Sequence, residues 1–215
     1  MNKQEVRACI ERVGIVPVVR AGSPEEALFA AQAISHGGIP IVEITMTVPG
    51  ATEVIQELAR NAPEILVGAG TVVNEESARK CLDVGAQFLV SPGFNAGTVN
   101  TARERDILIM AGALTPTEVM VAWEAGADFV KIFPCGNLGG AKYIQALKGP
   151  LPQVPMVPTG GVNLETAAEY IRAGAAALGV GGELVQKDAL KTRNAELLSG
   201  LAKQFAELVR TARNK

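Results

Sequence analysis

The stretch Asp128-Phe129-Val130-Lys131-Ile132-Phe133-Pro134 is an apolar run interrupted by a single lysine. Its β-branched and aromatic residues favour a strand, and such a run is typical of a strand buried on both faces of a parallel sheet. A charged lysine is unfavourable in such a place, so burial favours the free amine, which can attack a carbonyl carbon. Lys131 is therefore a candidate Schiff-base nucleophile. The alternative is a lysine that extends from the strand end into solvent.

The segments on both sides of this stretch repeat one pattern, a short apolar strand followed by an amphipathic helix. Strands are expected at residues 15–20, 39–45, 65–70, 87–90, 107–110, 128–134, 154–158 and 175–180. Helices are expected to follow at residues 23–35, 49–60, 74–84, 95–104, 115–126, 139–147, 163–172 and 194–213. Regular alternation of this kind indicates right-handed βαβ units around a parallel sheet.

Eight such units predict a protein of the α/β class, a (β/α)8 TIM barrel that forms a single domain over residues 1–215. A further amphipathic helix is expected at residues 2–12, as an extra N-terminal helix that covers the barrel floor. A doubly wound open sheet is the alternative. The absence of any break in composition between the units favours closure of the barrel.

The composition narrows the possible partners. The chain has 215 residues, 48% of them hydrophobic, and a net charge of −2 without a long basic run, which argues against nucleic acid. The polar N-terminal segment lacks the features of a signal peptide, and no apolar run reaches the ~18 residues of a membrane helix. One histidine and three scattered cysteines suggest neither a metal site nor disulfides. We expect a cytoplasmic protein with no metal, no cofactor and no membrane partner.

Polar residues and glycines recur at the carboxyl ends of the expected strands, where the active sites of such barrels lie. The set comprises Arg20, Glu43, Gly70-Thr71, Ser91-Pro92-Gly93, Lys131, Thr159-Gly160-Gly161 and Gly181-Gly182. Glu43 stands inside an apolar strand and, if it faces the barrel interior, could exchange protons near Lys131. The alternative for Glu43 is a purely structural ion pair with Lys131 or Arg20.

The loops after the seventh and eighth strands are rich in glycine. Glycines let backbone N–H groups approach an anion, and these two loops form the usual phosphate site of the barrel. Thr159-Gly160-Gly161 and Gly181-Gly182 therefore predict phosphate binding. Two tight turns without a ligand are the alternative.

Taken together, these residues resemble the family of 2-keto-3-deoxy-6-phosphogluconate (KDPG) aldolases, which includes 4-hydroxy-2-oxoglutarate (KHG) and 6-phosphogalactonate aldolases. The resemblance rests on Val42-Glu43-Ile44-Thr45, Gly68-Ala69-Gly70-Thr71-Val72, Ser91-Pro92-Gly93, Thr115-Pro116-Thr117-Glu118, Val130-Lys131-Ile132-Phe133-Pro134 and Pro158-Thr159-Gly160-Gly161. It implies a class I aldolase that cleaves KDPG to pyruvate and glyceraldehyde 3-phosphate, usually as a homotrimer. The KHG and 6-phosphogalactonate substrates are alternatives. A sugar-phosphate epimerase and a non-catalytic barrel scaffold are more distant ones.

The resemblance also implies a role for individual residues. Lys131 resembles the Schiff-base lysine and Glu43 the general acid/base, while Thr71 resembles the threonine near the pyruvyl group. The predicted substrate-binding set is Arg20, Thr71, Pro92, Phe133, Thr159, Gly160, Gly161, Gly181 and Gly182.

Two positions depart from the pattern of the family. Thr47 stands where many members have an arginine four residues after the catalytic glutamate. Gly182, followed by Glu183, stands where many have a serine in the last phosphate loop. The first change removes a cation, and the second places a carboxylate near the expected phosphate. Both bear on the choice of substrate and leave the chemistry of Lys131 intact.

Overall fold

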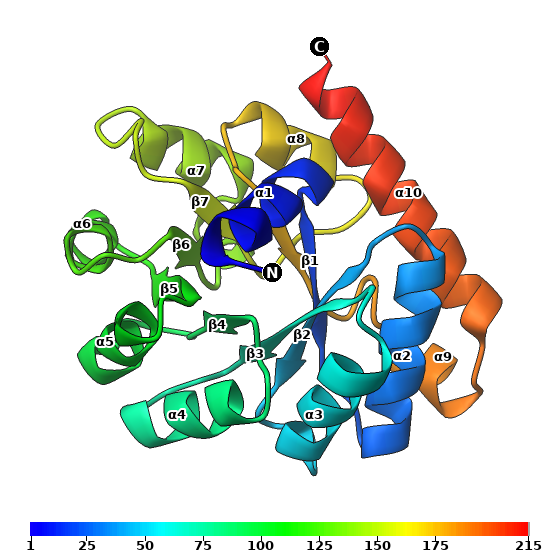
Figure 1. The fold of residues 1–215 in the computed structure, drawn as a ribbon. Helices are drawn as coiled ribbons and strands as arrows, with labels where there is room; N and C mark the ends of the chain where they lie inside the picture. Colours follow the sequence, from blue (N-terminus) through cyan, green and yellow to red (C-terminus); the bar gives the residue numbers. More distant parts are fainter. Residues whose placement is uncertain (215) are drawn as a thin grey trace.

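The computed structural model describes residues 1–214; Lys215, the last residue of the domain predicted over 1–215, lies outside the described residues. Within residues 1–214, eight parallel strands surround a common axis (Figure 1). They are β1 (Ile15–Val19), β2 (Ile41–Thr45), β3 (Leu66–Gly70), β4 (Phe88–Val90), β5 (Leu108–Ala113), β6 (Phe129–Ile132), β7 (Met156–Pro158) and β8 (Leu178–Val180).

The order of the strands decides between a barrel and an open sheet. Each strand pairs with its neighbour in sequence from β1 to β7, and β8 pairs with β1. A parallel bridge between Thr159 and Gly179 then joins the β7 edge to β8. The predicted (β/α)8 barrel is thus confirmed, and the doubly wound open sheet is excluded.

Helices form the outer ring in Figure 1. They are α2 (Pro24–His36), α3 (Ala51–Asn61), α4 (Glu75–Asp83), α5 (Ala96–Glu104), α6 (Pro116–Glu124), α7 (Ala141–Lys148), α8 (Ala167–Arg172), α9 (Lys187–Lys191) and α10 (Ala195–Arg213). Local sequence explains where they begin. The hydroxyl of Thr115 accepts a hydrogen bond from the Glu118 N–H, and the Glu118 carboxylate accepts one from the Thr115 N–H. This capping box begins α6.

Two helices differ from the expectation. The helix expected at 163–172 begins at Ala167, because the Asn163 side chain accepts hydrogen bonds from the N–H groups of Glu165 and Thr166 and holds residues 163–166 in a turn. The α9 helix was not predicted. It has five residues and buries only Ala189 and Leu190. A helix this short shows no helical period in the sequence.

The extra N-terminal helix, α1 (Lys3–Val13), lies across the centre of the strand ring in Figure 1. Two contacts attach it to the start of β6. Lys3 forms an ion pair with Asp128 at 2.9 Å, and the Arg7 guanidinium lies 5.3 Å from the centre of the Phe129 ring. These contacts close the barrel at its amino end, as predicted, so access to the interior is left to the carboxyl end.

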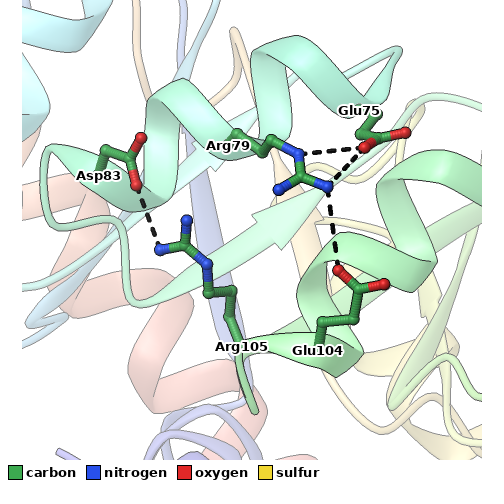
Figure 2. A network of polar contacts seen from close by, with 5 residues as sticks. All are labelled: Glu75, Arg79, Asp83, Glu104 and Arg105. Carbon is green, nitrogen blue, oxygen red and sulfur yellow. Dashed lines mark hydrogen bonds and ion pairs between the residues drawn. The ribbon is translucent and has the colours of Figure 1, made fainter.

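Outside the barrel, charged side chains connect neighbouring helices. Figure 2 shows such a network between α4 and α5, made of Glu75, Arg79, Asp83, Glu104 and Arg105. These side chains are about half exposed or more, so solvent screens the pairs and they contribute little to stability. Among residues 1–214, no helix is both long enough and apolar enough to cross a membrane.

Candidate active site

The side chains of Lys131 on β6 and Glu43 on β2 meet inside the barrel. Lys131 Nζ lies 3.7 Å from Glu43 Oε1, and the two side chains are 5% and 3% exposed. Within the described residues, Glu43 Oε1 accepts no hydrogen bond. A buried carboxylate oxygen without a donor is unfavourable, so this oxygen is available to a hydrogen-bond donor on a bound molecule.

The space for the Glu43 carboxylate comes from a glycine on the next strand. β2 and β3 pair in parallel, with Thr45 opposite Gly70. A Cβ atom on Gly70 would overlap the Glu43 carboxylate, so any side chain there would displace it. Gly70 is thus required for the position of Glu43, a role that the sequence analysis did not assign.

We predict that Gly70→Ala lowers kcat by about 100-fold, because displacement of a catalytic group by ~1 Å has an effect of that size. Steady-state kinetics measure it, with circular dichroism to confirm folding. Gly200→Ala is the matched control, because a Cβ there would meet no atom within 4 Å. Equal kcat values for the two variants would show that Gly70 does not position Glu43.

Thr71 follows Gly70 in a backbone conformation that β-branched residues rarely adopt, with φ at +59°. Hydrogen bonds hold the chain on both sides: Met46 N–H donates to the Gly70 carbonyl at 2.8 Å, and Val72 N–H donates to the Val90 carbonyl at 3.1 Å. Strain of this kind costs about 1–3 kcal/mol and is concentrated at functional sites. Thr71 therefore has a strained backbone at the carboxyl end of β3, next to Gly70.

Phe133 lies close to Lys131, and Pro92 lies against the neighbouring strand. Gly112 on β5 pairs with Lys131, and a Cβ on Gly112 would overlap the backbone of Pro92, so the Ser91-Pro92-Gly93 loop folds over β5. The Phe133 ring centre lies 5.5 Å from Lys131 Nζ. Both residues therefore lie close to the strand pair that carries the lysine.

A pocket of about 210 Å³ opens at the carboxyl end of the barrel. It gathers most of the predicted substrate-binding residues: Arg20, Phe133, Thr159, Gly160, Gly161, Gly181 and Gly182. Phe133 connects this pocket to Lys131. Thr71 and Pro92 do not line it: Thr71 follows Gly70, against which the Glu43 carboxylate packs, and Pro92 packs on Gly112, the β5 partner of Lys131. The predicted residues thus fall into two adjoining groups, one around the lysine and one between the glycine loops.

The pocket also includes residues outside the predicted substrate-binding set, namely Val18, Val162, Gly179 and Glu183. Val18 was within reach of the sequence, because it lies two residues before Arg20 in the predicted strand 15–20 and therefore on the same face. It also pairs with Glu43 on β2. Glu183 follows Gly182 and was expected near the phosphate, while Val162 and Gly179 lie within two residues of glycines in the predicted set.

Cys135 follows the Lys131 strand and is the nearest cysteine to the site in sequence. Its thiol is fully buried, it does not line the pocket, and burial raises its pKa to about 11. A thiolate, the reactive form, is therefore scarce at neutral pH. Cys135 is therefore a poor candidate for the nucleophile of this site.

The match to known proteins covers nearly the whole chain. The family model for KDPG and KHG aldolase matches residues 6–200. A 2-dehydro-3-deoxy-phosphogluconate aldolase from Treponema pallidum is 36% identical over 201 residues, which is 93% of this chain and 95% of the relative. The KHG/KDPG aldolase of Escherichia coli K12 is 34% identical over 194 residues, 90% of this chain and 91% of the relative.

One solved structure adds chemical detail. The KDPG aldolase of Legionella pneumophila, with pyruvate captured at low pH as a covalent carbinolamine intermediate, aligns with a TM-score of 0.86. It is 30% identical to this chain, and the alignment covers 92% of this chain and 96% of that one.

Proposed function

The chain belongs to the KDPG and KHG aldolase family, and on that premise we propose that Lys131 and Glu43 carry out its Schiff-base chemistry. The enzyme is a class I aldolase that cleaves KDPG to pyruvate and glyceraldehyde 3-phosphate. The observation that supports this assignment of residues best is the buried contact of 3.7 Å between Lys131 Nζ and Glu43 Oε1. Membership of the family argues against the epimerase and the scaffold.

The first half of the reaction forms the Schiff base. The unprotonated amine of Lys131 attacks the keto carbon of the substrate and gives a carbinolamine. Glu43 removes a proton from nitrogen and delivers one to the departing hydroxyl, which leaves as water. The product is an iminium whose positive nitrogen acts as an electron sink.

The second half breaks the carbon–carbon bond. Glu43, through a water molecule, takes the proton of the 4-hydroxyl group, and the electrons of the bond between the third and fourth carbons move into the iminium. Glyceraldehyde 3-phosphate leaves as the aldehyde, and the enamine of pyruvate remains on Lys131. Protonation of its third carbon by Glu43 and hydrolysis of the iminium release pyruvate and restore the amine.

The two groups of residues suit the two ends of the substrate. Thr71 and Pro92, near the lysine, would contact the pyruvyl part. The pocket would hold the phosphate through backbone N–H groups of its glycine loops and the guanidinium of Arg20. The Phe133 ring, which lies beside both groups, would contact the carbon chain between them.

A substrate profile tests the function. Pyruvate release is measured with KDPG, with its 6-phosphogalactonate epimer and with KHG, and we expect the highest kcat/KM for KDPG. KHG is the second candidate, because Thr47 adds no positive charge to the site and a relative is named for both activities. A higher kcat/KM for KHG would make it the principal substrate.

We also propose that the chain forms a homotrimer and acts in the cytoplasm. In residues 1–214, most of the large exposed apolar side chains come from four consecutive βα units: Val73, Phe94, Met120, Val121 and Leu138. Exposed apolar side chains on neighbouring units favour self-association. Three buried free thiols suit a reducing compartment. Analytical ultracentrifugation should give the mass of three chains, and a monomer mass at micromolar concentration would contradict the trimer.

A further inference from the structure

One charged group in the pocket does not suit an anion. Glu183 lines the pocket together with Arg20 and the glycine loops. Both side chains are exposed, and neither forms an ion pair with any other described residue. The pocket therefore combines one guanidinium with one carboxylate, and each is free to interact with a bound molecule.

The backbone holds Glu183 at this position. The N–H groups of Leu184 and Val185 both donate to the Gly181 carbonyl, at 3.0 and 2.8 Å, which closes a tight turn. The side chains of Leu184 and Val185 are buried and anchor the turn in the core. Glu183 can change its rotamer, but its Cα cannot move away from the pocket without breaking the turn.

The rest of the turn leaves room for a ligand. A Cβ on Gly181 or Gly182 would meet no atom within 4 Å, so this stretch opens directly into free space. Among residues 1–214, the N–H groups of Gly182 and Glu183 donate no hydrogen bond to the protein. The same short turn therefore offers free donors, which favour an anion, and a carboxylate, which opposes one.

We propose that Glu183 determines the charge selectivity of this pocket. Its carboxylate weakens the binding of a phosphate dianion and accepts hydrogen bonds from hydroxyl groups. The enzyme consequently also accepts 2-keto-3-deoxy acids whose distal end is an uncharged hydroxyl. The inference rests on the proposed aldolase function, and it concerns the class of substrate and not the reaction.

The size of the effect follows from the charges. A phosphate monoester carries about −1.5 to −2 charges at pH 7; at an assumed separation of about 7 Å in a largely aqueous setting, a carboxylate would change its affinity about 3- to 10-fold. Salt reduces this repulsion, because the Debye length is ≈ 8 Å at physiological ionic strength. The effect should therefore be larger at low salt.

The test compares kcat/KM for KDPG with kcat/KM for the same acid without phosphate. In Glu183→Gln, we expect the ratio of the two to rise about 3- to 10-fold at low ionic strength, mainly through a lower KM for KDPG. At about 1 M salt, where screening acts within ≈ 3 Å, the rise should largely disappear. Glu165→Gln is the control, because this exposed glutamate borders the neighbouring pocket and does not line this one.

Two results would overturn the inference: an unchanged ratio in Glu183→Gln, or an equal change in Glu165→Gln. Covalent labelling by pyruvate and borohydride, which does not involve the phosphate pocket, is measured on the same samples. Absence of labelling in the wild-type protein would refute the proposed function. Retained labelling with an unchanged ratio would refute the role of Glu183 alone.

Discussion

Lys131→Ala is expected to lower kcat/KM for KDPG cleavage by about 10⁴-fold or more, because the reaction then has no amine to form the iminium. Without the iminium, the electrons of the breaking carbon–carbon bond have no acceptor. Glu43 cannot replace the lysine, since a carboxylate makes no Schiff base. The loss should therefore appear in kcat and should not be overcome at saturating substrate.

Steady-state assays of pyruvate release measure this loss, with two comparison variants. Lys142→Ala removes an exposed lysine of α7 and should keep full activity. Lys131→Arg places a guanidinium beside Glu43 but supplies no amine of comparable nucleophilicity, so it should fold and be as inactive as the alanine variant. Turnover in Lys131→Ala within about tenfold of the wild type would point to different chemistry.

Glu43→Gln is expected to lower kcat by about 10²- to 10⁴-fold, the usual contribution of a general acid/base. The amide has nearly the shape of the carboxylate but cannot take up a proton. Each half of the proposed reaction needs proton transfers at this position, so the whole cycle slows. KM should change much less, because the pocket that would bind the phosphate does not include Glu43.

The same variant should also be less stable. Removal of one partner of a buried ion pair typically costs about 3–5 kcal/mol, and Glu43 and Lys131 are both almost fully buried. Urea unfolding measures this cost. Glu57→Gln, at an exposed position on α3, should change neither kcat nor stability. A Glu43→Gln enzyme with nearly wild-type kcat would assign the proton transfers to another group.

The barrel architecture could be predicted from the sequence, because its strands and helices appear as a regular alternation of apolar and amphipathic segments. Each apolar strand and each capped helix is a local signal, and eight repeats leave few ways to connect them. Helix α9 and the late start of α8 were not predictable in the same way. They depend on two buried side chains and on the hydrogen bonds of Asn163, which are too local to produce a period.

Lys131 and Glu43 could also be selected from the sequence, because a lysine and a glutamate are unexpected inside apolar strands. The distance between the two side chains could not be predicted, because it depends on the register of strands that are far apart in the chain. The same holds for Gly70, whose missing side chain makes space for Glu43. The left-handed backbone of Thr71 gives no signal in sequence either, because such a conformation is unusual for threonine.

Covalent trapping tests the role of Lys131 most directly. The protein is incubated with pyruvate, reduced with borohydride, digested and mapped by mass spectrometry. We predict one reduced pyruvyl group per chain, attached to Lys131, and none when pyruvate is omitted or when Lys131→Arg is used. An active protein with no adduct, or with its adduct on another lysine, would contradict the proposal that Lys131 is the Schiff-base nucleophile.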